Sequence, residues 1–280
     1  MTPIEALLPQ PAASCPRVVV LAAHPDDEIL GASSVLGRAA SCLVVHLTDG
    51  APFERELWPT DRPFGSREAY ARERRREAEA ALSLSGIPRE RIVCLGCPDQ
   101  RAAWSLLPLC QRVAAIVERY DPDCLVTHAY EGGHPDHDAA AFIARGALHM
   151  VEGDSHATLV EMATYHGASG SLCANQFLTA GTTRTLTHML SEAEQAHKRA
   201  LLACHATQHA LLSAFGVSEE RFRPAQHYDF SRPPHSGPLY YERVGMPLRG
   251  RTFCKLAAQA GRALGIAPLR RSGALRAAWR

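Results

Sequence analysis

Residues 18–28, which read VVVLAAHPDDE, decide the fold of this chain. Six apolar residues end at His24 and are followed at once by a proline and three carboxylates. An uninterrupted apolar run of this length is typical of a strand buried on both faces of a parallel sheet. We predict a strand that stops at His24 and a helix that begins near Glu28. The polar side chains would then lie in the crevice beyond the carboxyl edge of the sheet, where open α/β folds bind their ligands.

A second stretch repeats this arrangement later in the chain. The short apolar run CLVT at residues 124–127 precedes HPDH at residues 134–137. Neighbouring parallel strands bring their carboxyl ends to the same edge of a sheet. We therefore predict that both clusters belong to one site.

Strand and helix patterns alternate along the body of the chain. We expect strands near 17–23, 42–47, 92–95 and 124–127, with helices near 28–40, 66–85 and 105–120. This alternation predicts an α/β protein with a Rossmann-like, mostly parallel sheet and helices on both faces. Residues 51–65 contain three prolines and are predicted to form a loop over the site. Later we expect a strand at 159–165, a helix at 191–214 that starts with a capping box, and an ordered excursion at 221–238 that could shape specificity.

The two clusters offer the donor atoms of a metal site. His24 and Asp27 are three residues apart, as are His134 and His137. Two imidazoles and one carboxylate leave a metal with an open position for water, as in catalytic zinc sites. Asp26 would then be left over as a general base, and a spare histidine as a general acid or oxyanion stabiliser. Asp49, Asp99 and His128 also follow predicted strands, as substrate contacts or as supporting residues.

The same residues resemble a known family. AHPDDE at 23–28 and GHPDH at 133–137 are similar, in order and separation, to the paired signatures of the LmbE/PIG-L family of zinc-dependent de-N-acetylases. The likeness extends over roughly residues 16–245. It implies that His24, Asp27 and His137 hold zinc.

The resemblance also implies roles for four further residues. Asp26 corresponds to the general base, and His134 to the residue that stabilises the tetrahedral intermediate or protonates the amine. Arg74 and Asp99 correspond to residues that hold the hydroxyls of the amino sugar. One position departs from the pattern: some members have a tyrosine two residues before HPDH, whereas this chain has Gly132, with the nearest phenol at position 130.

Composition is that of a single enzyme domain outside the membrane. The chain has 280 residues, 46% of them hydrophobic, and no apolar run approaches the roughly 20 residues of a membrane span. Its first residues do not resemble a signal peptide, and nine scattered cysteines fit a reducing compartment. We therefore expect a cytoplasmic protein, and we expect no nucleic-acid partner.

Charge is distributed unevenly along the chain. Residues 1–242 carry a formal charge of −8 and residues 243–280 one of +9. We divide the chain into a single deacetylase domain at 1–245 and a basic tail at 246–280. Phe253, Leu256, Ala260 and Leu264 follow a helical spacing, which predicts an amphipathic helix in this tail. Such a helix could lie on the acidic body or associate weakly with an anionic membrane.

The sequence therefore predicts a zinc hydrolase that removes the acetyl group from an N-acetylglucosamine-type conjugate. Three alternatives stay open: an amidase for another N-acyl conjugate, a non-haem iron(II) oxygenase, and a sugar-binding module without catalysis. Two histidines and one carboxylate also form the facial triad of iron(II) oxygenases. Asp26 and His134 favour hydrolysis, which needs them. The chain has no Walker phosphate loop, and GASGS at 167–171 does not match the serine-hydrolase motif.

Overall fold

The computed structural model describes residues 16–36, 42–151, 153, 155–178 and 184–266. A seven-stranded sheet in the order β3-β2-β1-β4-β5-β9-β8 runs through them. The first five strands in this order are parallel, whereas β9 is antiparallel to both of its neighbours. Two short strands, β6 and β7, pair separately. The strands are β1 (Val18–Ala22), β2 (Cys42–Thr48), β3 (Ile92–Cys97), β4 (Cys124–His128), β5 (Thr158–Met162), β6 (Tyr165–His166), β7 (Cys173–Ala174), β8 (Leu186–Met189) and β9 (Glu219–Pro224).

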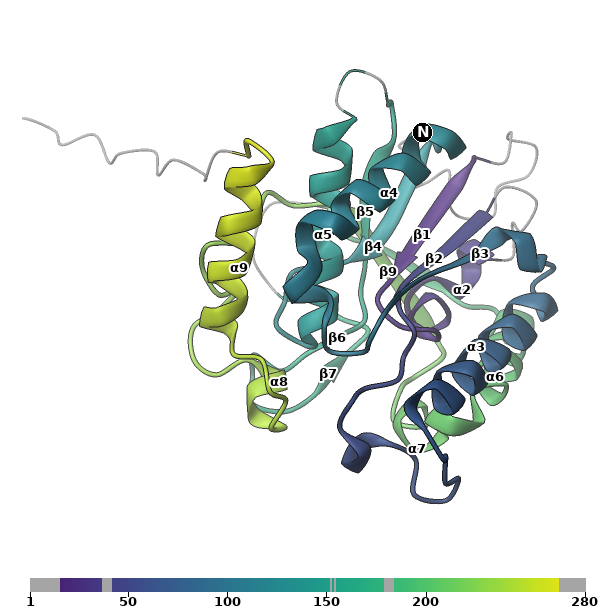
Figure 1. The fold of residues 1–280 in the computed structure, drawn as a ribbon. Helices are drawn as coiled ribbons and strands as arrows, with labels where there is room; N and C mark the ends of the chain where they lie inside the picture. Colours follow the sequence, from purple (N-terminus) through teal and green to yellow (C-terminus); the bar gives the residue numbers. More distant parts are fainter. Residues whose placement is uncertain (1–15, 37–41, 152, 154, 179–183, 267–280) are drawn as a thin grey trace, which may run out of the picture.

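Helices cover both faces of the sheet (Figure 1). α4, α5 and α9 pack on one face, and α2, α3 and α6 on the other. The mostly parallel α/β fold predicted from the sequence is therefore confirmed. The helices are α2 (Asp27–Leu36), α3 (Arg67–Leu84), α4 (Leu106–Tyr120), α5 (Pro135–Met150), α6 (Glu192–Ala203), α7 (His209–Leu212), α8 (Tyr240–Arg243) and α9 (Gly250–Ala263), with 3-10 turns η2 (Arg55–Leu57), η3 (Arg89–Arg91), η4 (Ala102–Ser105) and η5 (Ala206–Gln208).

The first strand shows why its sequence is apolar without interruption. Val19 and Leu21 point into the core beneath α4 and α5, while Val18 and Val20 point into the core beneath α2 and α6. All five residues of β1 are buried. Alternate side chains of a central strand therefore stabilise two separate cores, and neither face tolerates a polar residue.

The predicted helix at 191–214 is wrong in its second half. α6 begins with the expected capping box of Ser191 and Glu194 but ends at Ala203. The chain then turns at His205, which is fully buried, and continues as η5 and α7. A tertiary contact causes the break: the carboxylate of Glu77 accepts hydrogen bonds from the Thr207 backbone N–H at 2.8 Å and the Thr207 hydroxyl at 2.5 Å.

The segment at 221–238, predicted as an ordered excursion, begins within a strand. Its first residues belong to β9, which lies between β5 and β8 in the main sheet. Arg223 in β9 is buried, and its guanidinium contacts the carboxylates of Glu161 at 2.7 Å and Glu131 at 3.1 Å. These buried partners allow a charged residue to occupy an interior strand.

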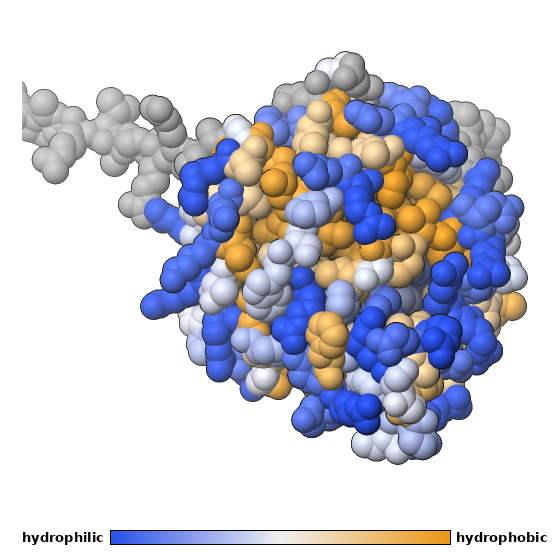
Figure 2. Space-filling view, in the orientation of Figure 1, coloured by the Kyte–Doolittle hydropathy of each residue, from blue (hydrophilic) through white to orange (hydrophobic). Residues whose placement is uncertain are grey.

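The basic tail contains a helix, α9, as the spacing of its apolar residues predicts. Phe253, Ala257 and Ala260 are buried in the core beneath α4 and α5, and Leu256 and Leu264 pack against it. In the space-filling view, hydrophobic side chains show between the polar ones over α4 and α5 (Figure 2). The apolar face of α9 is therefore covered by the protein itself, and residues 267–280 lie outside the described part. The division at residue 245 stays a prediction. No helix among the described residues is long and apolar enough to cross a membrane.

Candidate active site

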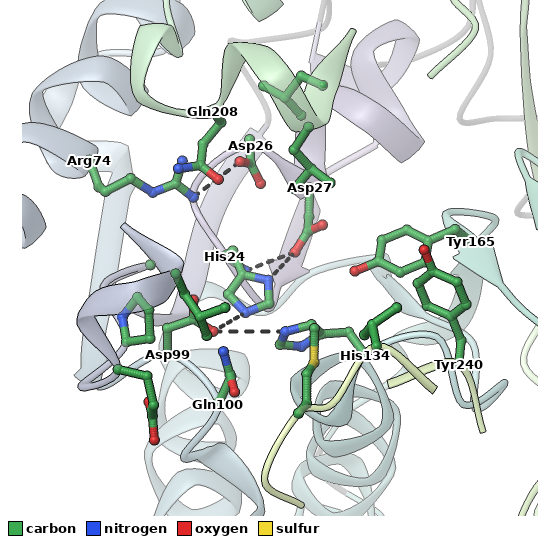
Figure 3. Close-up of a pocket in the computed structure, with 18 of the residues that line it drawn as sticks. His24, Asp26, Asp27, Arg74, Asp99, Gln100, His134, Tyr165, Gln208 and Tyr240 are labelled. Atoms are coloured by element: carbon green, nitrogen blue, oxygen red, sulfur yellow. Dashed lines mark hydrogen bonds and ion pairs between the residues drawn. The ribbon is translucent and has the colours of Figure 1, made fainter. Parts of the chain in front are cut away.

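The two motifs meet at the ends of adjacent strands. β1 pairs directly with β4, so that His24 after β1 and the start of α5 after β4 lie beside one another. The ring centroids of His24 and His134 are 4.5 Å apart, and those of His24 and His137 are 5.6 Å apart. His24 and His134 line a cavity of about 520 Å³, together with Asp26, Asp27 and Asp99 (Figure 3).

The three predicted metal ligands come together. Asp27 Oδ2 lies 3.0 Å from His24 Nδ1, and Asp27 Oδ1 lies 3.2 Å from His137 Nε2. The ring nitrogens of His24, His134 and His137 lie within 4.8 Å of one another. The buried His137 Nε2 faces Asp27 Oδ1 but forms no hydrogen bond of ordinary geometry with any described residue. Buried imidazole and carboxylate donors that converge in this way fit a divalent metal ion.

Asp27 is held in its charged form. Burial alone would raise the pKa of Asp27, but the neighbouring His137, together with a hydrogen bond to His24, outweighs it and holds this pKa well below its ordinary value. Asp27 is also the first residue of α2, where the helix dipole favours a negative charge. The carboxylate is therefore available as an anionic ligand.

His128 supports this cluster from behind. Its ring stacks on that of His137 with centroids 3.9 Å apart, and its Nε2 accepts a hydrogen bond from the Ala23 backbone N–H at 3.1 Å. Burial and the neighbouring His137 lower the pKa of His128 well below its ordinary value. His128 is thus a neutral residue that orients His137, as metal-site supporting residues commonly do.

Asp26 is held in an unusual backbone conformation beside the three predicted ligands. Its φ of 143° is one that residues other than glycine rarely adopt. Its Oδ2 accepts a hydrogen bond from Arg74 Nη2 at 3.0 Å, and the same nitrogen donates to the Pro25 carbonyl at 3.0 Å. Burial raises the pKa of Asp26 to about 7, although Arg74 opposes that shift. A carboxylate with such a pKa is suited to exchange protons near neutrality.

Arg74 is the arginine of its helix that reaches the cavity. It is 2% exposed, whereas Arg72, Arg75 and Arg76 on the same helix are not buried. Gly50 has a φ of 66°, and a Cβ built there would lie 2.7 Å from Arg74 Nε. Residue 50 must therefore be small to leave room for Arg74. In this arrangement Arg74 contacts Asp26 as well as lining the cavity.

Asp99 lies between the two motif histidines. Its Oδ1 is 3.0 Å from His24 Nε2 and 3.9 Å from His134 Nε2. Burial would raise the pKa of Asp99, but His24 outweighs it and holds this pKa well below its ordinary value. The fully buried Asp136 supports the same histidine at 3.3 Å and accepts the Gln100 backbone N–H.

The structure favours a neutral His134. Its Nδ1 accepts the backbone N–H of Asp136 at 3.1 Å and thereby caps α5. The neutral ring then carries its proton on Nε2. Burial and the neighbouring His24 lower the pKa of His134 well below its ordinary value. His134 can therefore donate one hydrogen bond without carrying a charge.

Tyr130, the tyrosine that lies nearest to the HPDH motif in the sequence, does not line the cavity. The Tyr130 hydroxyl donates to the Arg232 carbonyl at 2.8 Å, and its ring belongs to the core. Instead Tyr165, in β6, lines the cavity with its ring centroid 4.9 Å from that of His137. Tyr240, at the start of α8, lies beside it in Figure 3. In the sequence, Tyr165 was marked only by its position at the end of the strand predicted at 159–165. No feature of the sequence indicated that Tyr240 lies at the site.

Later segments of the chain complete the cavity. Gln208 at the end of η5 donates to the Tyr70 hydroxyl at 2.7 Å, and both line the cavity. The predicted loop at 51–65 overhangs it as expected. Further lining residues are Leu30, Pro52, Glu54, Glu56, Leu57, Gln100, Leu172, Leu211, Leu212, Phe215, Val244, Gly245, Met246 and Pro247.

Residues 19–148 match the sequence model of the PIG-L family, which is described as GlcNAc-PI de-N-acetylase. De-N-acetylases are hydrolytic enzymes. Both motifs and every residue with a predicted role in the site lie within the matched region. A comparison with curated protein sequences finds no match.

Solved deacetylase structures share the fold. The deacetylase of teicoplanin biosynthesis, solved as a complex with bog, superposes with a TM-score of 0.58 and 17% identity over 76% of this chain and 99% of that one. The A40926 pseudoaglycone deacetylase Dbv21 superposes with a TM-score of 0.56 and 18% identity over 74% of this chain and 96% of that one. The zinc-inhibited form of teicoplanin deacetylase Orf2 superposes with a TM-score of 0.55 and 16% identity over 76% of this chain and 99% of that one. The chain therefore carries a PIG-L (LmbE-like) family domain at residues 19–148, within the fold of these deacetylases.

Proposed function

We propose that this protein is a metal-dependent hydrolase that removes the N-acetyl group from an N-acetylglucosamine-type conjugate. One observation carries the proposal: Asp27 contacts both His24 and His137, at 3.0 Å and 3.2 Å, and the adjacent residue is a second buried carboxylate, Asp26, whose pKa burial raises to about 7. The family match and the deacetylases of the same fold support it.

His24, Asp27 and His137 are the residues that would hold the metal. A divalent ion there, zinc or alternatively iron(II), would lower the pKa of water and polarise the amide oxygen. Teicoplanin deacetylase Orf2, which has this fold, has been solved in a zinc-inhibited form. The identity of the ion that supports turnover is therefore the first property to measure.

Asp26 would act as the general base. It takes a proton from the water that attacks the amide carbon, and Arg74 stabilises the carboxylate before that step. The carbon–nitrogen bond then breaks, the proton passes to the leaving amine, and acetate and a free amino sugar result. The buried position of Asp26 keeps bulk water from competing for this proton.

His134 and the polar wall would position the substrate. The Nε2–H of His134 can donate to the oxygen that becomes negative during the attack. Asp99 and Gln208 offer acceptor oxygens, and Arg74 offers donors, for sugar hydroxyls on the same side of the cavity. Tyr165 supplies a further phenol near His137, in place of the one absent at position 132.

The test is release of acetate from N-acetylglucosamine conjugates by the metal-loaded protein. Mass spectrometry should show loss of one acetyl group, and Asp26→Asn should slow this loss by roughly 100-fold or more while the metal remains bound. Oxygen consumption without deacetylation would instead identify the iron(II) oxygenase. Binding of the conjugate without any product would identify a sugar-binding module.

A further inference from the structure

The cavity has two walls of different chemistry. In Figure 3, Arg74, Gln208 and Asp99 lie on one side of His24, and Tyr165 and Tyr240 lie on the other. Behind the two tyrosines the lining is apolar. Leu30, Leu212 and Phe215 form a small buried cluster against which Tyr165 and Leu172 pack. The first wall offers charged and amide side chains as hydrogen-bond partners for sugar hydroxyls. The second wall offers two phenols and otherwise apolar side chains.

The apolar wall continues to the mouth of the cavity. Leu57 in η2, Leu211 in α7 and Val244 after α8 all line the cavity, yet they are 51%, 52% and 51% exposed. Three separate segments thus present large apolar side chains to water at one opening. Single exposed apolar residues are ordinary, whereas a group of them at a cavity marks a binding surface.

An acetyl group is too small to account for this wall. It adds one methyl group beyond the amide carbon, while the apolar residues extend from Leu30 inside the cavity to Val244 at its mouth. Cavities of several hundred Å³ with such a lining bind apolar groups of drug-like size. Glu54 and Glu56 also line the cavity, and Arg74, the one arginine or lysine among its described lining residues, contacts Asp26. An uncharged chain therefore fits the mouth better than an anionic group.

We propose that the substrate carries an uncharged apolar chain, longer than a methyl group, that lies along this wall and crosses the Leu57–Leu211–Val244 mouth. The inference rests on the proposed function, because it places the chain next to the amide that is hydrolysed. This apolar chain belongs either to the N-acyl group or to the aglycone of the sugar, and an alkyl chain from either source would make the same contacts with the apolar wall.

Two ladders of substrates distinguish the sources. One holds the N-acetyl group constant and lengthens an alkyl glycoside of N-acetylglucosamine from methyl to octyl. The other lengthens the acyl group of N-acylglucosamine from acetyl to octanoyl. We expect kcat/KM of the metal-loaded full chain to rise about three- to fourfold per methylene that the wall covers, in one ladder and not in the other.

Variants at the mouth tie the effect to this wall. Leu211→Ser and Val244→Ser should reduce the gain per methylene, and their exposure makes misfolding a minor concern. Leu84→Ser and Met189→Ser are the controls, because these residues are 55% and 64% exposed and lie outside the cavity. They should leave the gain unchanged.

The outcomes separate the inference from the proposed function. Turnover that does not change with chain length in either ladder overturns the inference and leaves the hydrolase intact. Calorimetric binding that strengthens with chain length, with no product from any substrate, overturns the hydrolase and supports the inference. Absence of both binding and product overturns both.

Discussion

Residues 19–148 and residues 155–266 contribute differently to one cavity. The first region supplies the proposed metal ligands, the base and its partner Arg74, all of them at strand ends, helix starts or on α3, and the second adds the phenol of Tyr165 and the amide of Gln208. The second supplies most of the apolar wall, from β6, α7 and the turns around α8. Parallel strands place reactive side chains by a general rule of the fold. The walls depend on irregular segments, whose positions only tertiary contacts determine.

The largest effect should come from the proposed metal ligands in the first region. His137→Ala should lose the metal and reduce kcat by at least about 1000-fold, since the ion would stabilise the transition state by several kcal/mol. Elemental analysis of the purified protein measures the metal. His149→Ala is the matched control, because His149 lies on the same helix but is exposed. Full metal content in His137→Ala would show that another set of residues binds it.

Asp26→Asn should separate chemistry from metal binding. The amide cannot accept the proton of water, so that kcat should fall by roughly 100-fold or more while the metal content is unchanged. Steady-state acetate release and elemental analysis together measure this. Asp61→Asn, at an exposed carboxylate, should behave as the parent protein. Parental turnover by Asp26→Asn would rule out Asp26 as the base.

Glu77 connects the two regions, so its loss should weaken the whole fold. Glu77→Ala leaves the Thr207 N–H and hydroxyl without their partner, at a cost of about 2 kcal/mol in the free energy of unfolding. Urea unfolding measures it. Glu73→Ala on the same helix removes an exposed pair with Arg76 and should cost less than about 1 kcal/mol. Equal losses in the two variants would mean that the break after α6 does not depend on Glu77.

Arg74 should set the pH at which the base works. Burial raises the pKa of Asp26 to about 7, and the charge of Arg74 opposes this rise. Activity requires the unprotonated carboxylate, so it is present above this pKa and lost as the pH falls through it. Arg74→Gln removes the opposing charge and should move the acid limb of kcat/KM upward by about one pH unit. Arg75→Gln, at an exposed neighbour on α3, should leave the limb in place, and identical limbs in both variants would refute the role of Arg74.

The comparison also explains what the sequence could predict. The strands that precede His24 and His134 have unmistakable apolar runs, and the pairing of β1 with β4 brings both motifs together as expected. The end of α6 could not be predicted, because nothing in residues 191–214 reveals that Glu77 binds Thr207. Tyr165 was missed for the same reason: its approach to His137 depends on the packing of β6, and the sequence pointed only to the phenol nearest the motif.

The smallest effect concerns the basic residues at the end of the chain. The apolar face of α9 is buried in the protein core, so it is not available to enter a lipid bilayer. We propose that any membrane association is electrostatic, at about 1 kcal/mol for each basic residue at the surface, screened over roughly 8 Å at physiological salt. A chain that ends at residue 266 lacks Arg270, Arg271, Arg276 and Arg280 but keeps α9. It should sediment with anionic vesicles a few-fold less than the full chain, and the difference should disappear in high salt. Equal, salt-insensitive sedimentation of the two would leave these arginines without a role at membranes.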